Sequence, residues 1–186
     1  MTGFANPDAM RIEAVAPFGP PVFVIATVGG AATLLLPRES AVLTGETPEA
    51  VLEALTGVAL GPTSLRALLT GCVSDTAVNA GTVFPGGWAS LVFEDGSVMY
   101  LRRSGQRWTV RGAARGGWRV EYPSWTGTFP ATMRLQSADV DLMLELRQVE
   151  ANVELDAKAF AVSLPPGTRH VTLDEIRRSG ALKEPR

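Results

Sequence analysis

The stretch "WASLVFEDGSVMYLRR", Trp88 to Arg103, decides the fold class. From Trp88 onward the sequence favours a period of two, and Asp95-Gly96 is a preferred pair for a two-residue hairpin turn. The segment therefore predicts two antiparallel strands. More segments with the same period follow it: "RWTVRG", "GWRVEYPSW", "FPATMRLQS", "VDLMLELRQV" and "FAVSLPPG". Strands joined by tight turns along the chain predict an antiparallel meander.

Upstream of this hairpin the sequence predicts further strands. "MRIEAVAP" alternates in polarity, and "VFVIATV" and "AATLLLP" are apolar, rich in β-branched residues and joined at Gly29-Gly30. This pair predicts a second hairpin, followed by a short strand at Ala41–Leu43. Only 16 residues precede Pro17, which leaves room for one strand there.

Two short helices are predicted between the two groups of strands. Thr47 can cap a helix whose first residue is Pro48, and Gly57 is a typical helix end. A second helix is predicted over residues 63–70, with Gly71 as its C-terminal stop. Each helix has one leucine face. Near the C-terminus "TLDEIRRSG" predicts one or two helical turns.

Size and composition predict one ordinary globular domain over residues 1–186. Hydrophobic residues make up 46% of the 186 residues, charged residues 19%, and the formal net charge is −2. One cysteine and one histidine exclude a disulfide framework and a zinc site built from several of these residues. No apolar run reaches 18 residues, and "MTGFANPDAM" lacks the features of a signal peptide.

The four residues "LTGC", ending at Cys72, spell a bacterial lipobox. A lipobox follows a signal peptide of about 15–30 residues, and Cys72 lies far deeper in the chain. We therefore interpret Cys72 as a small, partly buried thiol at a helix exit.

Three segments resemble one known family. They are "APFGPPVF" (16–23), "LTGVALGPTSLRALLTG" (55–71) and "GWRVEYPSWTGTFPATMRLQ" (117–136), and their order and spacing are similar to those of the LolA/LolB outer-membrane lipoprotein localisation family. The resemblance covers roughly residues 10–150. Unlike LolB-type proteins, this sequence shows no signal peptide and no N-terminal lipidated cysteine, and its predicted first strands are fewer.

The resemblance implies a mainly β (α+β) fold, a curled antiparallel half-barrel with a short helical lid over an apolar cavity. It implies a non-enzymatic role in receiving lipoproteins by their acyl chains, at the periplasmic face of the outer membrane. The implied partners are acyl chains or lipids, a periplasmic carrier of the LolA type, and the membrane surface. The protein is expected to be monomeric and to use no cofactor, metal or nucleic acid.

The leucine faces and the alternating strand residues supply the predicted lipid-binding set, although the same residues are equally suited to plain core packing. The set comprises Leu52, Leu55, Leu65, Leu68, Leu69, Trp118, Tyr122, Met133, Leu135, Leu142 and Leu144. Phe18, between Pro17 and Pro20, matches a leucine at the exposed tip of the family's hairpin, so it is a candidate membrane wedge. The alternative is a phenylalanine folded back onto the core.

An acid-free series of arginines is interleaved with Trp108 and Trp118: Arg102, Arg103, Arg107, Arg111, Arg115 and Arg119. Such a series suits a solvated hairpin face, anionic headgroups or a partner surface, and less well single-stranded nucleic acid.

Two other functional classes stay open. One is a non-catalytic structural or interaction domain of the cell envelope with a filled core. The other is a hydrolase that uses His170, although no GxSxG motif exists, and the carboxylate pairs Asp139/Asp141 and Asp174/Glu175 are typical of a surface.

Overall fold

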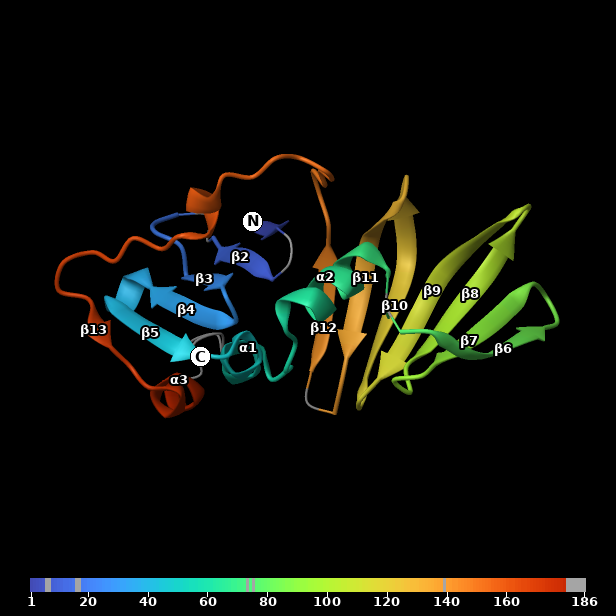
Figure 1. Cartoon of the computed structure of the whole chain (residues 1–186), viewed down its shortest axis with the longest axis horizontal. Helices are drawn as coiled ribbons and strands as arrows, with labels where there is room; N and C mark the ends of the chain where they lie inside the picture. Colours follow the sequence, from blue (N-terminus) through green and yellow to red (C-terminus); the bar gives the residue numbers. More distant parts are fainter. Residues whose placement is uncertain (6–7, 16–17, 73, 75, 139, 180–186) are drawn as a thin grey trace. The chain divides into compact units, whose positions relative to one another are not determined.

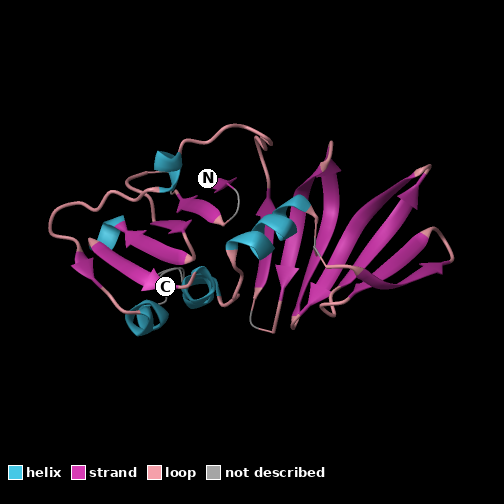
Figure 2. Ribbon diagram, viewed as in Figure 1, coloured by secondary structure: helices cyan, strands magenta, loops and turns pink. Residues whose placement is uncertain are grey.

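The computed structural model describes residues 1–5, 8–15, 18–72, 74, 76–138 and 140–179. The chain is mainly β, with two sheets and three α-helices in its described part (Figures 1 and 2). It forms two compact units. The first comprises Met1–Thr63 together with Asn152–Arg186, and the second comprises Ser64–Ala151.

The first unit contains a six-stranded sheet. Its strands, in spatial order, are β1 (Thr2–Ala5), β2 (Ala9–Ala14), β3 (Phe23–Val28), β4 (Ala31–Leu36), β5 (Ala41–Glu46) and β13 (Arg169–His170). The first five strands pair antiparallel in chain order, and β13 pairs parallel to β5. A short 3₁₀ helix, η1 (Pro37–Glu39), connects β4 to β5.

Both faces of this sheet are covered, which explains its continuous apolar runs. Val24, Leu35 and Val42 pair across β3, β4 and β5 and form one buried row, against which Val162 packs. The next row, on the opposite face, is also buried and comprises Ile25, Leu34 and Leu43. The helix α1 (Pro48–Thr56) contacts β4, while η2 (Ala157–Phe160) contacts β2 and β3.

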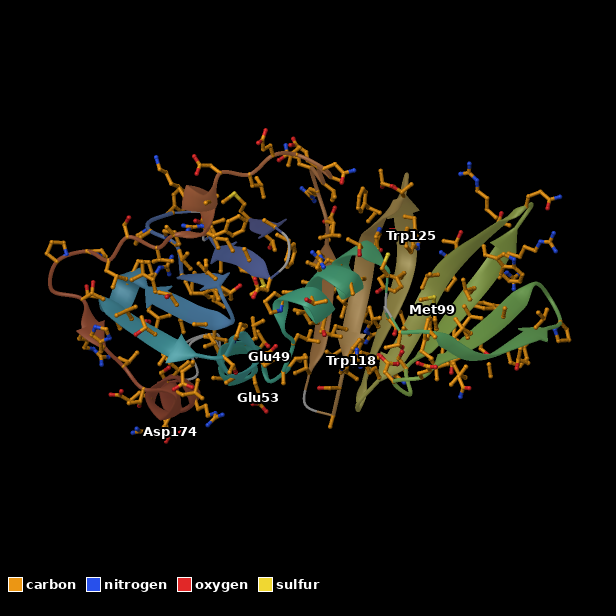
Figure 3. The ribbon with its side chains drawn as sticks, in the orientation of Figure 1. Glu49, Glu53, Met99, Trp118, Trp125 and Asp174 are labelled. Carbon is orange, nitrogen blue, oxygen red and sulfur yellow. The ribbon has the colours of Figure 1, made fainter. Side chains whose placement is uncertain are left out.

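The ends of α1 match the sequence prediction. The Thr47 hydroxyl accepts a hydrogen bond from the backbone N–H of Ala50 at 3.3 Å, and the helix ends at Gly57. The helix α3 (Leu173–Ser179) packs against α1. Arg177 of α3 lies 3.9 Å from Glu53 of α1 and 3.4 Å from Asp174 (both acidic residues are labelled in Figure 3).

The second unit is a seven-stranded antiparallel meander. Its strands, in both chain order and spatial order, are β6 (Val78–Phe84), β7 (Trp88–Phe93), β8 (Val98–Ser104), β9 (Arg107–Arg115), β10 (Trp118–Thr126), β11 (Phe129–Gln136) and β12 (Asp141–Glu145). The predicted turn at Asp95-Gly96 joins β7 to β8. The helix α2 (Pro62–Thr70) precedes the sheet and ends at Gly71.

The register gives this sheet two chemically different faces, because directly paired residues project to the same side. On the apolar face one row crosses all seven strands: Gly81, Leu91, Met99, Ala113, Val120, Leu135 and Leu142. On the opposite face the adjacent row begins with Ala80, Val92, Val98 and Ala114 and becomes polar at Arg119, Gln136 and Asp141 on β10–β12, so we call it the polar face.

Three sequence predictions about elements are wrong or incomplete. "FAVSLPPG" is not a strand: Phe160 is buried at the end of η2, and Pro165-Pro166 lacks the N–H donors that a ladder needs. Two strands rather than one, β1 and β2, precede Pro17. The strand β6 was not predicted, and its seven residues are all exposed, with no alternation of burial.

In the part of the chain that the structure describes, the helices are too short or too polar to cross a membrane.

Candidate functional site

The six strand residues predicted to bind lipid share the apolar face of the second unit. Trp118, Val120 and Tyr122 are spaced two residues apart along β10, so their side chains project to the same face. The other four pair directly with one another, as Met133 with Leu144 and Leu135 with Leu142. The period of two therefore placed these side chains correctly relative to one another. Their role in lipid binding stays a prediction.

The helix α2 lies against this face at β10. The phenol of Tyr122 donates a hydrogen bond of 2.8 Å to the backbone carbonyl of Leu68. Leu68 is buried, and Leu65 and Leu69 are half-buried. Trp125, labelled in Figure 3, lies beside Gly71 at the end of the helix, and its indole N–H donates to the Val110 carbonyl at 3.0 Å.

The remaining two predicted lid residues belong to the first unit. Leu52 and Leu55 are buried on α1, the helix that contacts β4 and α3. The five leucines predicted to form one lid are thus divided between two compact units.

Exposure changes across the apolar face from its centre to its edge. Met99, Val120, Tyr122 and Met133 are buried at the centre. Leu142, on the edge strand β12, is 39% exposed. The face therefore has a packed centre and an accessible apolar margin.

Sequence reasoning missed several members of this face, notably Met99, Val120 and Trp125. Val120 was in phase with Trp118 and Tyr122, so the period of two was a sufficient signal for it. The register of β10 shifts between Glu121 and Trp125, so the period of two does not predict which face Trp125 occupies.

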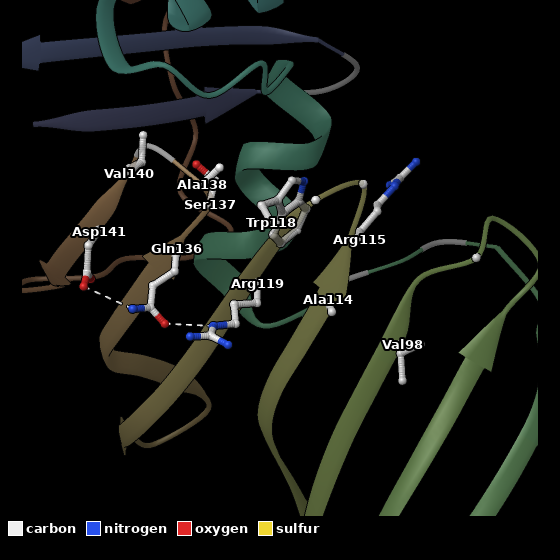
Figure 4. Close-up of a pocket in the computed structure, with 13 residues that line it drawn as sticks. Val98, Ala114, Arg115, Trp118, Arg119, Gln136, Ser137, Ala138, Val140 and Asp141 are labelled. Carbon is white, nitrogen blue, oxygen red and sulfur yellow. Dashed lines mark hydrogen bonds between the residues drawn. The ribbon is translucent and has the colours of Figure 1, made fainter.

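A first hollow, of about 830 Å³, lies at one end of β8–β12 (Figure 4). Trp118, Arg119, Gln136 and Asp141 are among its lining residues. Arg119 Nε donates to Gln136 Oε1 at 2.9 Å, and Gln136 Nε2 donates to Asp141 Oδ2 at 3.1 Å. Hydrogen bonds from Arg134 and Gln136, with the Arg134 bond contributing most, lower the pKa of Asp141 to about 2.

A second hollow, of about 590 Å³, opens on the polar face between β7 and β10. Neither hollow is lined by Leu65, Leu68 or Leu69. The predicted apolar cavity beneath a helical lid therefore stays a prediction.

Phe18 is 90% exposed, which rules out the alternative that it folds back onto the core. It lies in the connection between β2 and β3, next to Gly19, whose φ is +86°. Arg38 Nη2 donates to the Pro20 carbonyl at 3.3 Å and holds the far side of this connection. Pro17, the other proline of the predicted tip, lies outside the described residues.

The arginine series is spread over both faces of the second sheet. Arg102 stacks over Trp88 with 5.1 Å between its Cζ and the ring centroid, and Arg103 stacks over Trp108 at 6.0 Å. Arg115 Nη1 lies 3.3 Å from Asp95 Oδ2. Hydrogen bonds from the Ser97 hydroxyl and backbone N–H, aided by Arg115, lower the pKa of Asp95.

Of the remaining candidate residues, Asp141, His170 and Asp174 are exposed. His170 lies on β13, and Glu175 accepts hydrogen bonds from Thr172. No group of three or more His, Cys, Asp or Glu that could hold a metal ion occurs among the described residues. Asp139 lies outside them.

Cys72 is exposed, so the expectation of a partly buried thiol is wrong. The reason is local: Gly71 turns the chain out of α2 with a φ of +74°, and Cys72 is the first residue beyond this turn.

No protein-family model and no curated protein matches this sequence.

Proposed function

We propose that this protein is a non-enzymatic acyl-chain binder of the LolA/LolB type. In this proposal the second sheet curls as a half-barrel, α2 acts as its lid, and lipoprotein acyl chains or lipids are received at the periplasmic face of the outer membrane. The three resembling segments support the family assignment, and two of them contain α2 and the strand pair β10–β11.

The observation that carries the proposal is the apolar row across all seven strands, with α2 on the same face. A sheet exposes a wide apolar face to water only at a cost, so such a face is normally covered by another element or by a ligand. Here Leu68 covers the centre at β10, while the margin at Leu142 and Leu144 stays at least partly accessible. This margin is where an acyl chain would first contact the protein.

Partition of hydrocarbon would drive binding without any chemical step. Each buried methylene contributes about 0.8 kcal/mol, so four methylenes contribute about 3 kcal/mol. Met99 and Met133 lie at the centre of the face, and flexible thioether side chains adapt to chains of different shape. Binding of a long chain requires α2 to shift at Leu65, Leu68 and Leu69, and its return would favour release.

Phe18 is the proposed membrane contact. Its exposed ring is available for insertion among lipid headgroups, where aromatic rings are favoured. The match to the leucine at the tip of the family's hairpin supports this role.

One observation favours the second candidate, a cell-envelope interaction domain with a filled core. Tyr122, Met133 and Val120 are already packed, and the two hollows described above do not open beneath α2. A core of this kind would leave the protein without an acyl ligand.

The test is lipid occupancy. We would purify the protein gently from a bacterial envelope, measure its intact mass under native conditions, and extract any lipid. About one acyl ligand per chain supports the proposal. A bare protein that also fails to take up a fluorescent fatty acid supports the filled-core alternative.

A matched pair of variants locates the site. Leu69→Ser changes the half-buried face of α2, whereas Leu164→Ser changes an exposed leucine of the first unit. Fatty-acid uptake should fall in Leu69→Ser and be unchanged in Leu164→Ser. Equal uptake by both variants and the wild-type protein would contradict a site beneath α2.

A further inference from the structure

Two bulges lie side by side on the polar face of the second sheet. In β9, Arg111 is an extra residue, because Tyr100 pairs with Gly112 while Leu101 pairs with Val110. In β10 the register shifts between Glu121 and Ser124, at Tyr122-Pro123. Bulges redirect side chains and occur often beside binding sites.

The guanidinium of Arg111 bridges the two bulges. Its Nη1 donates to the carbonyl oxygens of Tyr122 at 3.4 Å and Pro123 at 3.2 Å. These carbonyls lie where the irregular register interrupts the regular ladder. The bridge fixes a positive charge at one side of the 590 Å³ hollow, which Arg111 and Pro123 both line.

A glycine forms the floor of the hollow. Gly112 lies between Tyr100 and Glu121 in one cross-strand row. A Cβ on Gly112 would lie 2.9 Å from the backbone oxygen of Val120, so this position excludes a side chain. The open space between Tyr100 and Glu121 is therefore a consequence of the backbone itself.

Two aromatic rings also line the hollow. Trp88 pairs with Arg102, two residues along β8 from Tyr100, so the two rings are diagonal neighbours on one face. Trp88 is 38% exposed and Tyr100 is 46% exposed, and both line the hollow. Such rings provide flat apolar surfaces next to polar groups.

The charges around the hollow are mixed but mainly positive. Arg111 and Arg119 line it, together with the single carboxylate of Glu121. Arg102 is not among the lining residues, but it stacks over Trp88, which is one of them. Among the described residues no acidic group forms a salt bridge with Arg102, Arg111 or Arg119, whereas Arg134 is paired with Asp141 and Arg115 with Asp95.

We propose that this hollow binds an acidic sugar, either a free oligosaccharide or the headgroup of a glycolipid. The C–H face of a pyranose ring would lie on Trp88 and Tyr100, and its carboxylate or phosphate would meet Arg111 and Arg119. Glu121 would accept hydrogen bonds from ring hydroxyls. This site lies on the face opposite α2, and the proposal does not depend on acyl-chain binding.

Glu121 favours a sugar over single-stranded nucleic acid. A nucleic-acid groove presents many cations along a continuous phosphate path, and the Glu121 carboxylate in the lining of the hollow would repel that backbone. Sugar hydroxyls, in contrast, need acceptors. The formal net charge of −2 also gives no general attraction for polyanions.

The test uses the full chain and defined probes. A trimer of galacturonic acid and a neutral trimer of galactose are titrated by calorimetry and by tryptophan fluorescence. We expect the wild-type protein to bind the acidic trimer. The neutral trimer should bind at least about tenfold more weakly, because it lacks the carboxylates that accept hydrogen bonds from the two guanidinium groups.

The chain offers a matched control for the aromatic lining of the hollow. Trp88 and Trp108 each stack with an arginine and are similarly exposed, but only Trp88 lines the hollow. Trp88→Ala and Arg119→Gln should each weaken binding of the acidic trimer about tenfold. Trp108→Ala should leave it unchanged. Circular dichroism and the melting midpoint confirm that each variant is folded.

Three results would overturn the proposal. The first is no binding of either trimer at millimolar concentration. The second is an equal loss in Trp88→Ala and Trp108→Ala, when both variants are folded. The third is equally tight binding of a single-stranded oligonucleotide, which would indicate unselective attraction of anions.

Vesicles distinguish the two sources of the sugar. Wild-type protein is added to phosphatidylglycerol vesicles with and without a glucuronosyl diacylglycerol. Selective binding to the glycolipid vesicles, lost in Arg119→Gln, supports a headgroup ligand. Binding of the free trimer without this selectivity supports a free oligosaccharide. Loss of fatty-acid uptake in Leu69→Ser would leave either result unaffected.

Discussion

Tyr122 and Leu68, which are 54 residues apart in sequence, are joined by a buried hydrogen bond of 2.8 Å from the phenol to the backbone carbonyl. This contact fixes α2 against β10. Burial, and to a smaller extent the nearby Cys72, raises the pKa of the Tyr122 phenol well above its ordinary value of 10.0. The phenol is therefore protonated at neutral pH and can donate this hydrogen bond.

Tyr122→Phe should lower the free energy of unfolding by about 1 kcal/mol, because it removes this donor from a buried carbonyl. The loss is limited, since the N–H of Gly71 also donates to the Leu68 carbonyl, at 3.2 Å. The measurement is urea denaturation. Tyr100→Phe is the matched control, with a change of less than about 0.5 kcal/mol expected because Tyr100 is exposed. Equal effects of both substitutions would contradict the assignment.

Gly71→Ala should be more destabilising than an ordinary glycine substitution. Gly71 has a φ of +74°, and a Cβ there would lie 2.5 Å from Cη2 of Trp125. The left-handed backbone alone costs about 1 kcal/mol or more for alanine. The clash with Trp125 adds to this cost.

Gly96→Ala separates the two contributions. Gly96 has a similar φ, +78°, but a Cβ added there would have no neighbouring atom within 4 Å. Thermal denaturation of both variants should show the larger loss for Gly71→Ala. A loss no larger than that of Gly96→Ala would mean that Trp125 moves aside without cost.

Asp95, in the β7–β8 turn, should make the free energy of unfolding depend on pH. Its carboxylate accepts hydrogen bonds from the Ser97 N–H at 2.9 Å and the Ser97 hydroxyl at 2.6 Å, which lowers its pKa below the ordinary 3.8. A lowered folded-state pKa means that the stabilisation is present above the unfolded-state pKa and is lost as pH falls through the folded-state value.

The measurement compares the unfolding free energies of the wild-type protein and Asp95→Ala at pH 7 and at pH 3. The difference between the two proteins should be larger at pH 7. Ser97→Ala removes one donor, so it should weaken this pH dependence. The same difference at both pH values would argue against the lowered pKa.

Phe18→Glu should leave the unfolding free energy within about 0.5 kcal/mol of the wild-type value, because the side chain is 90% exposed. Binding to lipid vesicles should fall strongly, since the ring would no longer enter the headgroup region. Cosedimentation with vesicles measures this loss. The control is Val28→Glu, at another exposed apolar position of the first unit. Equal vesicle binding by both variants would contradict the role of Phe18 as a membrane contact.

Local patterns predicted those parts of the fold that depend on neighbouring residues. Asp95-Gly96 fixed the β7–β8 hairpin, and Thr47-Pro48 with Gly57 gave the ends of α1. The strand β6 was not predicted because its seven residues are all exposed and carry no pattern of alternating burial. Prediction of β13 failed for a different reason, since its pairing with β5 joins residues more than 120 positions apart.

By itself, the sequence determined a mainly β meander, two short helices, and the shared face of Trp118, Tyr122, Met133, Leu135, Leu142 and Leu144, because these follow from periods of two and from local capping. The tertiary structure decided the rest. It assigned Leu52 and Leu55 to a different unit from Leu68, and it created the hollow at Gly112 from two adjacent bulges. Long-range packing and register shifts depend on contacts that no local pattern encodes.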